Sequence, residues 1–239
     1  DSKDTGDANT ITFWSNHPGS SRDLEEEMIK EFEEENPDLH VELVTAGSNY
    51  EEVAQRFNAS LAGGDQPDVL VASDVTWFNF ALNEATTPLD ELWEKEGLDP
   101  DSYVDTLRED YEYNGKHYGA PYSRSTNLMY WNTDDLAAAG LPADRGPETW
   151  EEFDEWAAKL KEQTGNPALV IPDGSNYLDW YFQGMVWAFG GAYSNEWEPS
   201  FSDPKTLEAA KFLQDQVNKG HIEISTDPTV AFGLSLIHI

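Results

Sequence analysis

A short apolar run near residue 70 is followed directly by side chains that can bind or stack. The run is Val69–Ala72, and after it come Ser73, Asp74, Thr76 and Trp77. Such a run is typical of a strand that is buried on both faces of an α/β sheet. Because ligands of open α/β sheets bind beyond the carboxyl ends of the strands, these positions predict the floor of a binding cleft. The alternative is that Asp74 only caps the following helix, which we expect to run through Asn83.

A carboxylate next to an aromatic ring suits a sugar or another polyol. The carboxylate accepts two hydroxyl hydrogens in charge-assisted hydrogen bonds, and the ring covers the weakly apolar C–H face. Asp74 and Trp77 supply one such pair. Tyr177 and Trp180 can supply further rings, because they are three residues apart in a predicted helix over residues 175–189 and so share one face. Core packing stays open as the alternative for these two aromatic residues.

The chain is strongly acidic, with 47 acidic residues against 14 basic ones and a net charge of −33. Such a surface repels nucleic acid and anionic membranes, which excludes most polyanion-binding functions. It also repels itself unless salt screens it, and the screening length falls to about 3 Å at 1 M. Because the acidity is spread over helix faces, we infer that it serves solvation in concentrated salt. We therefore expect a halophilic, haloarchaeal source.

No catalytic motif accompanies this acidity. The chain has no cysteine, which excludes disulfides, thiolate nucleophiles and cysteine-ligated zinc. It also lacks a glycine-rich phosphate loop, a Gly-x-Ser-x-Gly elbow and a His-Glu-x-x-His helix, and its five histidines are scattered. A glycosidase needs only two carboxylates, but among 47 acids such a pair carries no information. We expect no catalysis, no metal and no cofactor.

Alternating strands and helices must position the binding residues. The first half predicts strands over residues 11–14, 39–43 and 69–72, and this β-α-β-α-β order requires a mostly parallel sheet with helices on both faces. The polar loop over residues 15–20 follows the first strand and is a second candidate for the cleft rim. Apolar residues at helical spacing predict the buried face of the first helix: Leu24, Met28, Ile29 and Phe32. A capping box over Ser48–Glu51 predicts the second helix, which ends at Gly63 and Gly64.

The second half repeats this alternation of strands and helices. It follows an Asn114-Gly115 hairpin and a crossing between lobes over residues 121–126. It predicts a helix over 134–139, a helix after a Thr149 cap, a helix over 175–189, and a helix over 207–217 after an Asp203-Pro204 cap, and it predicts a strand over 168–171. We assign Tyr181 and Trp187 to the core. The chain then divides into a flexible acidic leader (1–9), lobe one (10–121), a partial lobe two (122–233) and a non-native tail (234–239), for which a short native strand is the alternative.

Several short segments occur in an order and at a spacing that together identify a family, although each segment alone is a weak signal. They are Ile-Thr-Phe-Trp at 11–14, Asn-Tyr-Glu-Glu at 49–52, Pro-Asp-Val at 67–69, Tyr-Gly-Ala-Pro-Tyr at 118–122, Leu-Met-Tyr-Trp-Asn at 128–132 and Pro-Glu-Thr-Trp-Glu-Glu-Phe at 147–153. Together they resemble the family 1 extracellular solute-binding proteins of ABC importers, most closely the glycerol-3-phosphate-binding branch beside the sugar binders. The similarity spans about residue 10 to residue 233.

The resemblance implies a type II two-lobe α/β fold, joined by crossing strands and incomplete at the C-terminus. It implies hinge closure on a sugar or glycerol-3-phosphate-like solute, which the protein delivers to the membrane permease subunits of an ABC importer. It also implies an extracytoplasmic, cell-surface protein that is lipid-anchored and monomeric. The polar start of the chain is typical of a processed protein whose signal peptide or lipid anchor has been removed, and a sequence cropped at its start is the alternative. A secreted carbohydrate-active enzyme and a ligand-sensing receptor on the same fold stay open as alternatives.

The resemblance also implies a set of solute contacts. Tyr50 matches a ligand-contacting tyrosine, and Asp74 matches an acidic contact that is glutamate in the family and so one methylene longer. Ser125 matches a serine in the crossing segment. Tyr177 and Trp180 lie where the family places a pair of cleft tryptophans. The predicted set is therefore Tyr50, Asp74, Trp77, Arg124, Ser125, Tyr177 and Trp180.

Arg124 departs from the family, because it replaces a small polar residue in the crossing segment. If the ligand carries phosphate or carboxylate, the guanidinium can meet it with a bidentate fork. A salt bridge to one of the many nearby carboxylates is the alternative. The identity of the ligand, a neutral sugar or a phosphorylated polyol, stays open.

Overall fold

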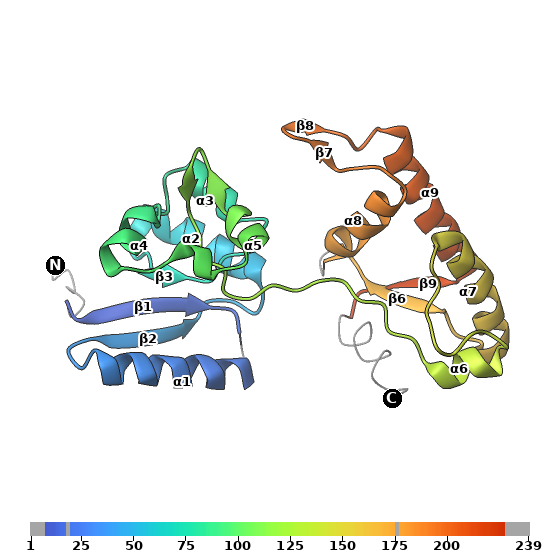
Figure 1. Ribbon diagram of the computed structural model, residues 1–239, viewed down its shortest axis with the longest axis horizontal. Helices are drawn as coiled ribbons and strands as arrows, with labels where there is room; N and C mark the ends of the chain where they lie inside the picture. The colour runs from blue at the N-terminus through green and yellow to red at the C-terminus, as the bar shows by residue number, and fades with distance from the viewer. Residues whose placement is uncertain (1–7, 18–19, 175–176, 228–239) are drawn as a thin grey trace. The chain divides into compact units, whose positions relative to one another are not determined.

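Two compact units make up the chain, and they divide between Arg124 and Ser125, within the predicted crossing segment (Figure 1). The structure is a computed structural model that describes residues 8–17, 20–174 and 177–227. The predicted tail at 234–239 and most of the predicted leader lie outside the described residues. Each unit has its own hydrophobic core and is described by itself.

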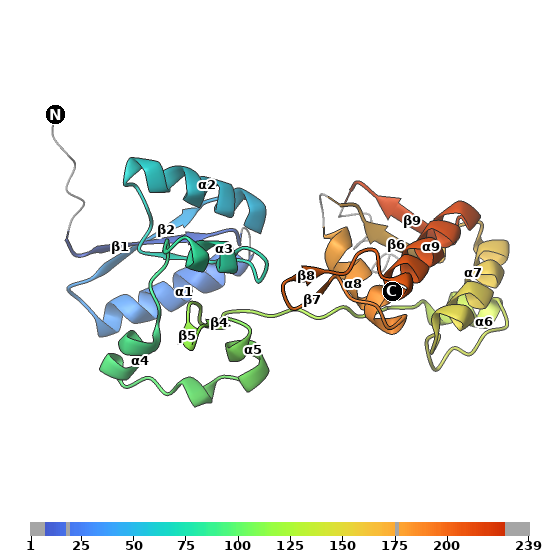
Figure 2. The same cartoon turned by 90° about the horizontal axis from the view of Figure 1, so that it is seen from above.

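The first unit is built on a parallel sheet with the strand order β2-β1-β3. Its strands are β1 (Thr10–Ser15), β2 (His40–Thr45) and β3 (Val69–Leu70), in a register that places Phe13 between Leu43 and Val69. The connecting helices are α1 (Ser20–Glu35) and α2 (Tyr50–Gly63), which cover opposite faces of the sheet (Figure 2). The predicted β-α-β-α-β order is confirmed.

β3 is shorter and more open than the sequence predicts. It pairs with β1 only at Val69 and Leu70, and the side chain of Val69 is 49% exposed. The prediction of a strand buried on both faces is therefore wrong. β3 is an edge strand of the described sheet, and burial is restored only at Val71, just after it.

The face that α1 turns toward the sheet also differs from the prediction. Leu24, Met28 and Phe32 are exposed, and within residues 21–35, where the structure describes the burial of this helix, the fully buried residue is Glu25. The helix is thus rotated about its own axis, by about one residue position, from the orientation that its apolar residues predict. The polar partners of Glu25 at the end of β1 account for this rotation, because a buried carboxylate must be hydrogen-bonded.

The cap of α2 lies one residue later than predicted. Asn49 is the N-cap and accepts the Glu52 backbone N–H at 2.9 Å, while the Glu52 carboxylate accepts the Ser48 N–H and hydroxyl at 2.7 and 2.8 Å. These hydrogen bonds from Ser48 hold the pKa of Glu52 below its ordinary value. Gly64 ends the helix with a left-handed φ of 82°, as predicted. The cap places Tyr50 at the first position of the helix.

The remaining elements of the first unit follow β3 along the chain. They are α3 (Trp77–Leu82), α4 (Asp90–Glu96), the short 3-10 helix η1 (Pro100–Ser102), α5 (Asp105–Glu109), β4 (Glu112–Tyr113) and β5 (Lys116–His117). The β4–β5 hairpin turns at Asn114 and Gly115, both with positive φ, as predicted. In the core, Phe57 of α2 meets Phe80 of α3 edge to face, with ring centroids 4.8 Å apart. This contact fixes α2 and α3 against each other.

In the second unit, helices α7, α8 and α9 share a core with a parallel strand pair, β6 (Leu169–Pro172) and β9 (Ile222–Ser225), and α6 packs on α7. The helices are α6 (Thr133–Ala138), α7 (Trp150–Thr164), α8 (Leu178–Ala188) and α9 (Pro204–Lys219), and β7 (Ser194–Asn195) pairs with β8 (Glu198–Pro199) in a hairpin. The caps of α7 by Thr149 and of α9 by Asp203 are confirmed. Two expectations are wrong: Trp187, which we assigned to the core, is 60% exposed, and the crossing segment over residues 121–126 is not a strand.

Two glycines of the second unit give a matched stability test. A Cβ at Gly191 would lie 2.7 Å from the Thr206 backbone nitrogen of α9, whereas a Cβ at Gly184 within α8 would meet nothing within 4 Å. Gly191→Ala should therefore lower the free energy of unfolding by about 1–3 kcal/mol, because backbone atoms must move. Gly184→Ala should raise it by up to about 1 kcal/mol, because alanine favours helix. Denaturant unfolding measures both, and equal shifts in the two variants would contradict this packing.

Candidate functional site

Polar and aromatic side chains of the first unit gather at the carboxyl edge of its sheet. Asn16 and His17 follow β1, Tyr50 begins the helix after β2, and Asp74 follows β3. The three strands are parallel, so their carboxyl ends lie at the same edge. This edge is therefore the candidate site of the first unit.

Asp74 does not cap a helix. α3 begins after Thr76 with no side-chain cap, and the Ser73 hydroxyl accepts the Val75 N–H at 3.0 Å. The Asp74 carboxylate accepts the Ser73 hydroxyl at 3.2 Å through one oxygen, and its other oxygen lies 3.4 Å from the Arg124 guanidinium. The capping interpretation is wrong, and the Asp74 side chain stays 40% exposed at the edge.

Arg124 joins this edge from the segment that follows β5. Its guanidinium lies 2.9 Å from the Asp110 carboxylate and donates to the Tyr111 hydroxyl at 3.3 Å. Burial alone would lower the pKa of Arg124, but the bond to Tyr111 and the charges of Asp74 and Asp110 hold it above the ordinary value. Arg124 is thus ion-paired to two carboxylates of its own unit, which is the arrangement that the sequence offers as the alternative to a ligand contact.

An aromatic wall stands beside the pair of Asp74 and Arg124. The Trp77 ring stacks on Tyr118 with centroids 6.5 Å apart and meets Tyr111 edge to face at 5.8 Å. Tyr111 and Tyr118 are absent from the predicted set. They flank the predicted Asn114-Gly115 hairpin. The hairpin prediction alone could therefore have placed the two tyrosines next to each other on adjacent strands. The edge therefore offers a carboxylate and flat rings together, as recognition of a polyol requires.

Glu25 is the second acid of the edge, and the sequence gives no sign of its role. Its side chain is only 2% exposed, and one carboxylate oxygen accepts the Ser15 hydroxyl at 2.7 Å, the His17 Nδ1 at 3.0 Å and the Tyr122 hydroxyl at 3.1 Å. The sequence masks it, because Glu25 lies in an acidic run and outside the apolar stripe that we expected to face the sheet.

Tyr50 connects to this acid through His17. The His17 Nε2 lies 3.4 Å from the Tyr50 hydroxyl, and the rings meet edge to face with centroids 6.1 Å apart. The other face of His17 stacks on Tyr122 at 5.7 Å. Burial and the hydrogen bond to Glu25 raise the pKa of Tyr122 to about 12, so its hydroxyl remains a donor. Of the residues in this cluster, only Tyr50 belongs to the predicted set.

The predicted residues of the second unit are Ser125, Tyr177 and Trp180. Ser125 is exposed at the start of the unit. Tyr177 precedes α8 as its N-cap residue with a left-handed φ of 77°, so the prediction that it shares a helix face with Trp180 is wrong. Tyr177 is 43% exposed, whereas Trp180 is half-buried and packs edge to face on Tyr181. A non-glycine residue in this conformation stores about 1–2 kcal/mol of strain, a feature that clusters at ligand sites.

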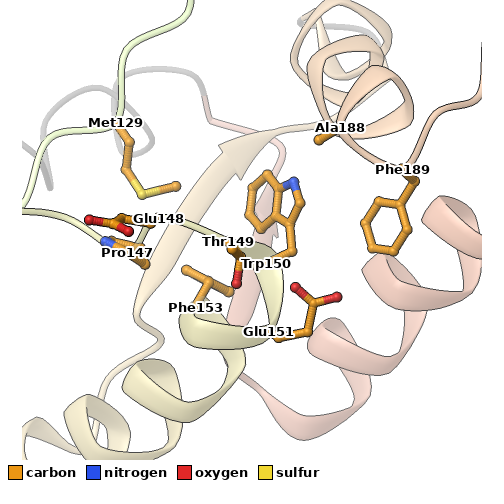
Figure 3. A pocket seen from close by; sticks show the side chains of 9 residues that line it. All are labelled: Met129, Pro147, Glu148, Thr149, Trp150, Glu151, Phe153, Ala188 and Phe189. Atoms are coloured by element: carbon orange, nitrogen blue, oxygen red, sulfur yellow. The ribbon is translucent and has the colours of Figure 1, made fainter.

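A cavity of about 420 Å³ opens in the second unit at the start of α7 (Figure 3). Its lining residues are Met129, Pro147, Glu148, Thr149, Trp150, Glu151, Phe153, Ala188 and Phe189. Two of its polar groups serve to cap α7, since Thr149 accepts the Glu152 N–H and the Glu148 N–H is donated to Glu152. None of the predicted solute contacts lines this cavity.

No helix within residues 8–17, 20–174 and 177–227 is long and apolar enough to cross a membrane. In the same part of the chain, no three histidine, aspartate or glutamate side chains come together as a metal site.

Comparison with known proteins gives consistent matches. A family model described as "Bacterial extracellular solute-binding protein" matches residues 16–230. The sn-glycerol-3-phosphate-binding periplasmic protein UgpB of Escherichia coli (strain K12) is 28% identical over 156 residues, which cover 64% of this chain and 35% of that protein. The arabinooligosaccharide-binding protein of Bacillus subtilis (strain 168) is 25% identical over 211 residues, 87% of this chain and 47% of that one.

Solved structures match over more of the chain. UgpB from Mycobacterium tuberculosis, in complex with glycerophosphocholine, is 44% identical with a TM-score of 0.88, over 95% of this chain and 59% of that one. The GacH receptor of Streptomyces glaucescens is 21% identical with a TM-score of 0.73, over 91% and 54%. The chain thus spans roughly half the length of the proteins that it matches.

Proposed function

Because this chain belongs to the bacterial extracellular solute-binding protein family and has the type II periplasmic-binding-protein fold predicted from its sequence, we propose that it binds a small hydroxylated solute for an ABC importer. The solute is a glycerol phosphate or one of its diesters, and a neutral oligosaccharide is the second candidate. The matched family and the relatives described above are binding proteins, so we propose binding rather than catalysis.

One observation supports this site more strongly than any other. The half-exposed Asp74 carboxylate lies at the carboxyl edge of the sheet, beside the aromatic wall that includes Trp77. Each carboxylate oxygen has two acceptor positions, so Asp74 can accept solute hydroxyls while it stays paired with Ser73 and Arg124. Tyr50 adds a hydroxyl at the same edge. We also propose that Ser125, Tyr177 and Trp180 of the second unit are solute contacts.

The likeness to a glycerophosphocholine complex favours a phosphate-bearing solute. Glycerol hydroxyls suit Asp74 and Tyr50, and a quaternary ammonium group suits aromatic faces such as those of Trp180 and Tyr177. Arg124 can shift from its two carboxylates toward a phosphate, or stay with them if the solute is neutral. Family membership indicates an extracytoplasmic location. We further propose a lipid-anchored monomer from a halophile.

Calorimetry in molar sodium chloride tests the proposal, with glycerophosphocholine, sn-glycerol-3-phosphate and maltose as probes and choline chloride and inorganic phosphate as controls. We expect heat from at least one glycerol phosphate and a higher melting temperature, since a ligand at 100 times its Kd stabilises the fold by about 2.7 kcal/mol. Heat from maltose alone would move the assignment to oligosaccharides. No binding by any probe, or the appearance of a hydrolysis product, would overturn the proposal.

A further inference from the structure

The cavity at the start of α7 brings aromatic rings and carboxylates together. Its volume of about 420 Å³ lies within the range of small-molecule sites, about 300–1,000 Å³. Trp150, Phe153 and Phe189 supply its rings, and Figure 3 shows the Trp150 indole standing between the carboxylates of Glu148 and Glu151. None of the described residues that line the cavity is basic. The cavity therefore joins an apolar wall to negative charge.

The Trp150 ring is held in place by other rings of the second unit. It meets Phe153 edge to face with centroids 5.4 Å apart, and it lies 5.7 Å from the ring of Phe212. Phe212 in turn packs against Phe189 at 5.4 Å. The aromatic wall is thus ordered before a ligand arrives, which lowers the entropy cost of binding.

The two carboxylates at the cavity are not neutralised by a basic side chain. In the part of the chain that the structure describes, neither Glu148 nor Glu151 forms an ion pair. The Arg145 guanidinium is bound to Glu152 at 2.7 and 2.8 Å, and this bond, with a smaller part from the charge of Glu148, raises the pKa of Arg145. The net charge of −33 adds to the negative field. The cavity should therefore attract cations and repel anions.

Quaternary ammonium is the class of cation that suits such a wall. Its N-methyl groups carry the positive charge and stack on aromatic faces without needing hydrogen-bond acceptors. A primary ammonium must instead place three N–H donors, for which the rings offer no acceptor. Cations already lie over indole rings elsewhere in this chain: the Arg56 guanidinium is 4.4 Å from the centroid of Trp14, and that of Arg145 is 5.0 Å from Trp156.

We propose that this cavity binds a small organic cation of the quaternary ammonium class. Trp150 and Phe189 cover the N-methyl groups, and Glu148 and Glu151 supply the opposite charge. The inference goes beyond the proposed function and does not depend on it, because no predicted solute contact lines the cavity. The same carboxylates should exclude an anion such as sn-glycerol-3-phosphate.

A nuclear magnetic resonance titration of the full chain with choline chloride in molar sodium chloride tests the proposal. We expect saturable shift changes at the Trp150 indole and at the backbone amides of Glu148 and Glu151. The control is the neutral isostere in which a carbon atom replaces the nitrogen of choline. It keeps the shape and loses the charge, so it should bind about fivefold more weakly or not at all. Equal affinity for the two compounds, or shift changes that miss the cavity, would overturn the proposal.

Substitutions at Trp150 test the contribution of the ring. Trp150→Leu should weaken choline binding about tenfold, because leucine has no π face. Trp150→Phe should weaken it only about threefold, because phenylalanine keeps a face with a smaller negative potential. Circular dichroism checks that both variants fold. Equal losses in two folded variants would show that the ring face is not what binds the cation.

Glu151→Gln tests the charge and stays informative if Trp150→Leu does not fold, because Glu151 is exposed. It should weaken choline binding about twofold to fivefold, the value of one exposed opposite charge. Glu155→Gln is the matched control, since Glu155 is exposed one turn farther along α7 and does not line the cavity. It should leave the affinity unchanged. Equal losses would mean that choline responds to net charge alone, and the site would fail.

The failure of this site and the failure of the proposed function have different signatures. A wild-type chain that binds sn-glycerol-3-phosphate but shows no shift change at Trp150 with choline keeps the proposed function and loses this site. A chain that binds choline at Trp150 and none of the glycerol phosphates or maltose keeps this site and loses the proposed function.

Discussion

In dilute buffer the chain should lose much of its helical circular dichroism signal, and it should regain that signal in molar sodium chloride. The cause is the surplus of carboxylates, because the chain has 47 acidic residues against 14 basic ones. The carboxylates repel one another over a screening length of about 10 Å at 0.1 M salt but only about 3 Å at 1 M. Sucrose at equal osmolality is the control, because it strengthens burial without screening charge. A spectrum that stays constant from dilute to molar salt would contradict the halophilic interpretation.

α1 is the helix where this effect should be largest. It ends with Glu33, Glu34 and Glu35, and no basic residue stands in its last turn. Three negative charges at the negative end of the helix dipole favour fraying. Glu35→Lys should therefore stabilise the helix by about 0.3–1 kcal/mol at low ionic strength and lower the salt concentration at which the signal returns. An unchanged salt midpoint would show that the terminal charges are not the cause.

Asp74→Asn should weaken solute binding by about 10- to 100-fold. A hydrogen bond to a charged group contributes about 1.5–3 kcal/mol, and the amide keeps the shape of the side chain but loses the charge. Calorimetry with whichever glycerol phosphate binds the wild type measures the loss. The fold should be unaffected, because the Asp74 carboxylate is partly exposed and its protein contacts are to Ser73 and Arg124.

Asp110→Asn is the matched control for this substitution. Asp110 is the other carboxylate that pairs with Arg124, at 2.9 Å, and it is not a predicted solute contact. The control variant removes the same charge from the same arginine, so we expect a loss of about threefold or less. Equal losses in the two variants would mean that Asp74 acts through Arg124 and not on the solute.

Most elements could be predicted because their ends are set by local chemistry. The Thr149 cap, the Asp203-Pro204 start, the Asn114-Gly115 turn and the glycine stop after Gly63 each satisfy backbone groups within a few residues. The orientation of α1 was not predictable in this way. It depends on a hydrogen bond between Glu25 and residues of a neighbouring strand and of a segment 97 positions away.

The site shows the same division between local and distant causes. Asp74 and Tyr50 could be placed because both follow strands whose carboxyl ends share one edge. The pairing of Arg124 with Asp74 spans 50 positions, so a sequence in which acids are abundant leaves its partner open. Tyr177 was misplaced for a third reason, because a left-handed tyrosine at a helix start has no local sequence signal.

A backbone amide titration with sn-glycerol-3-phosphate in molar salt reports where on the chain the solute binds. If the carboxyl edge of the first sheet holds the solute, the largest nitrogen-15 and proton shift changes will occur at Tyr50, Asp74 and Trp77, with a further change at the indole of Trp180. Shift changes centred on the cavity around Trp150, with the carboxyl edge unchanged, would rule this site out.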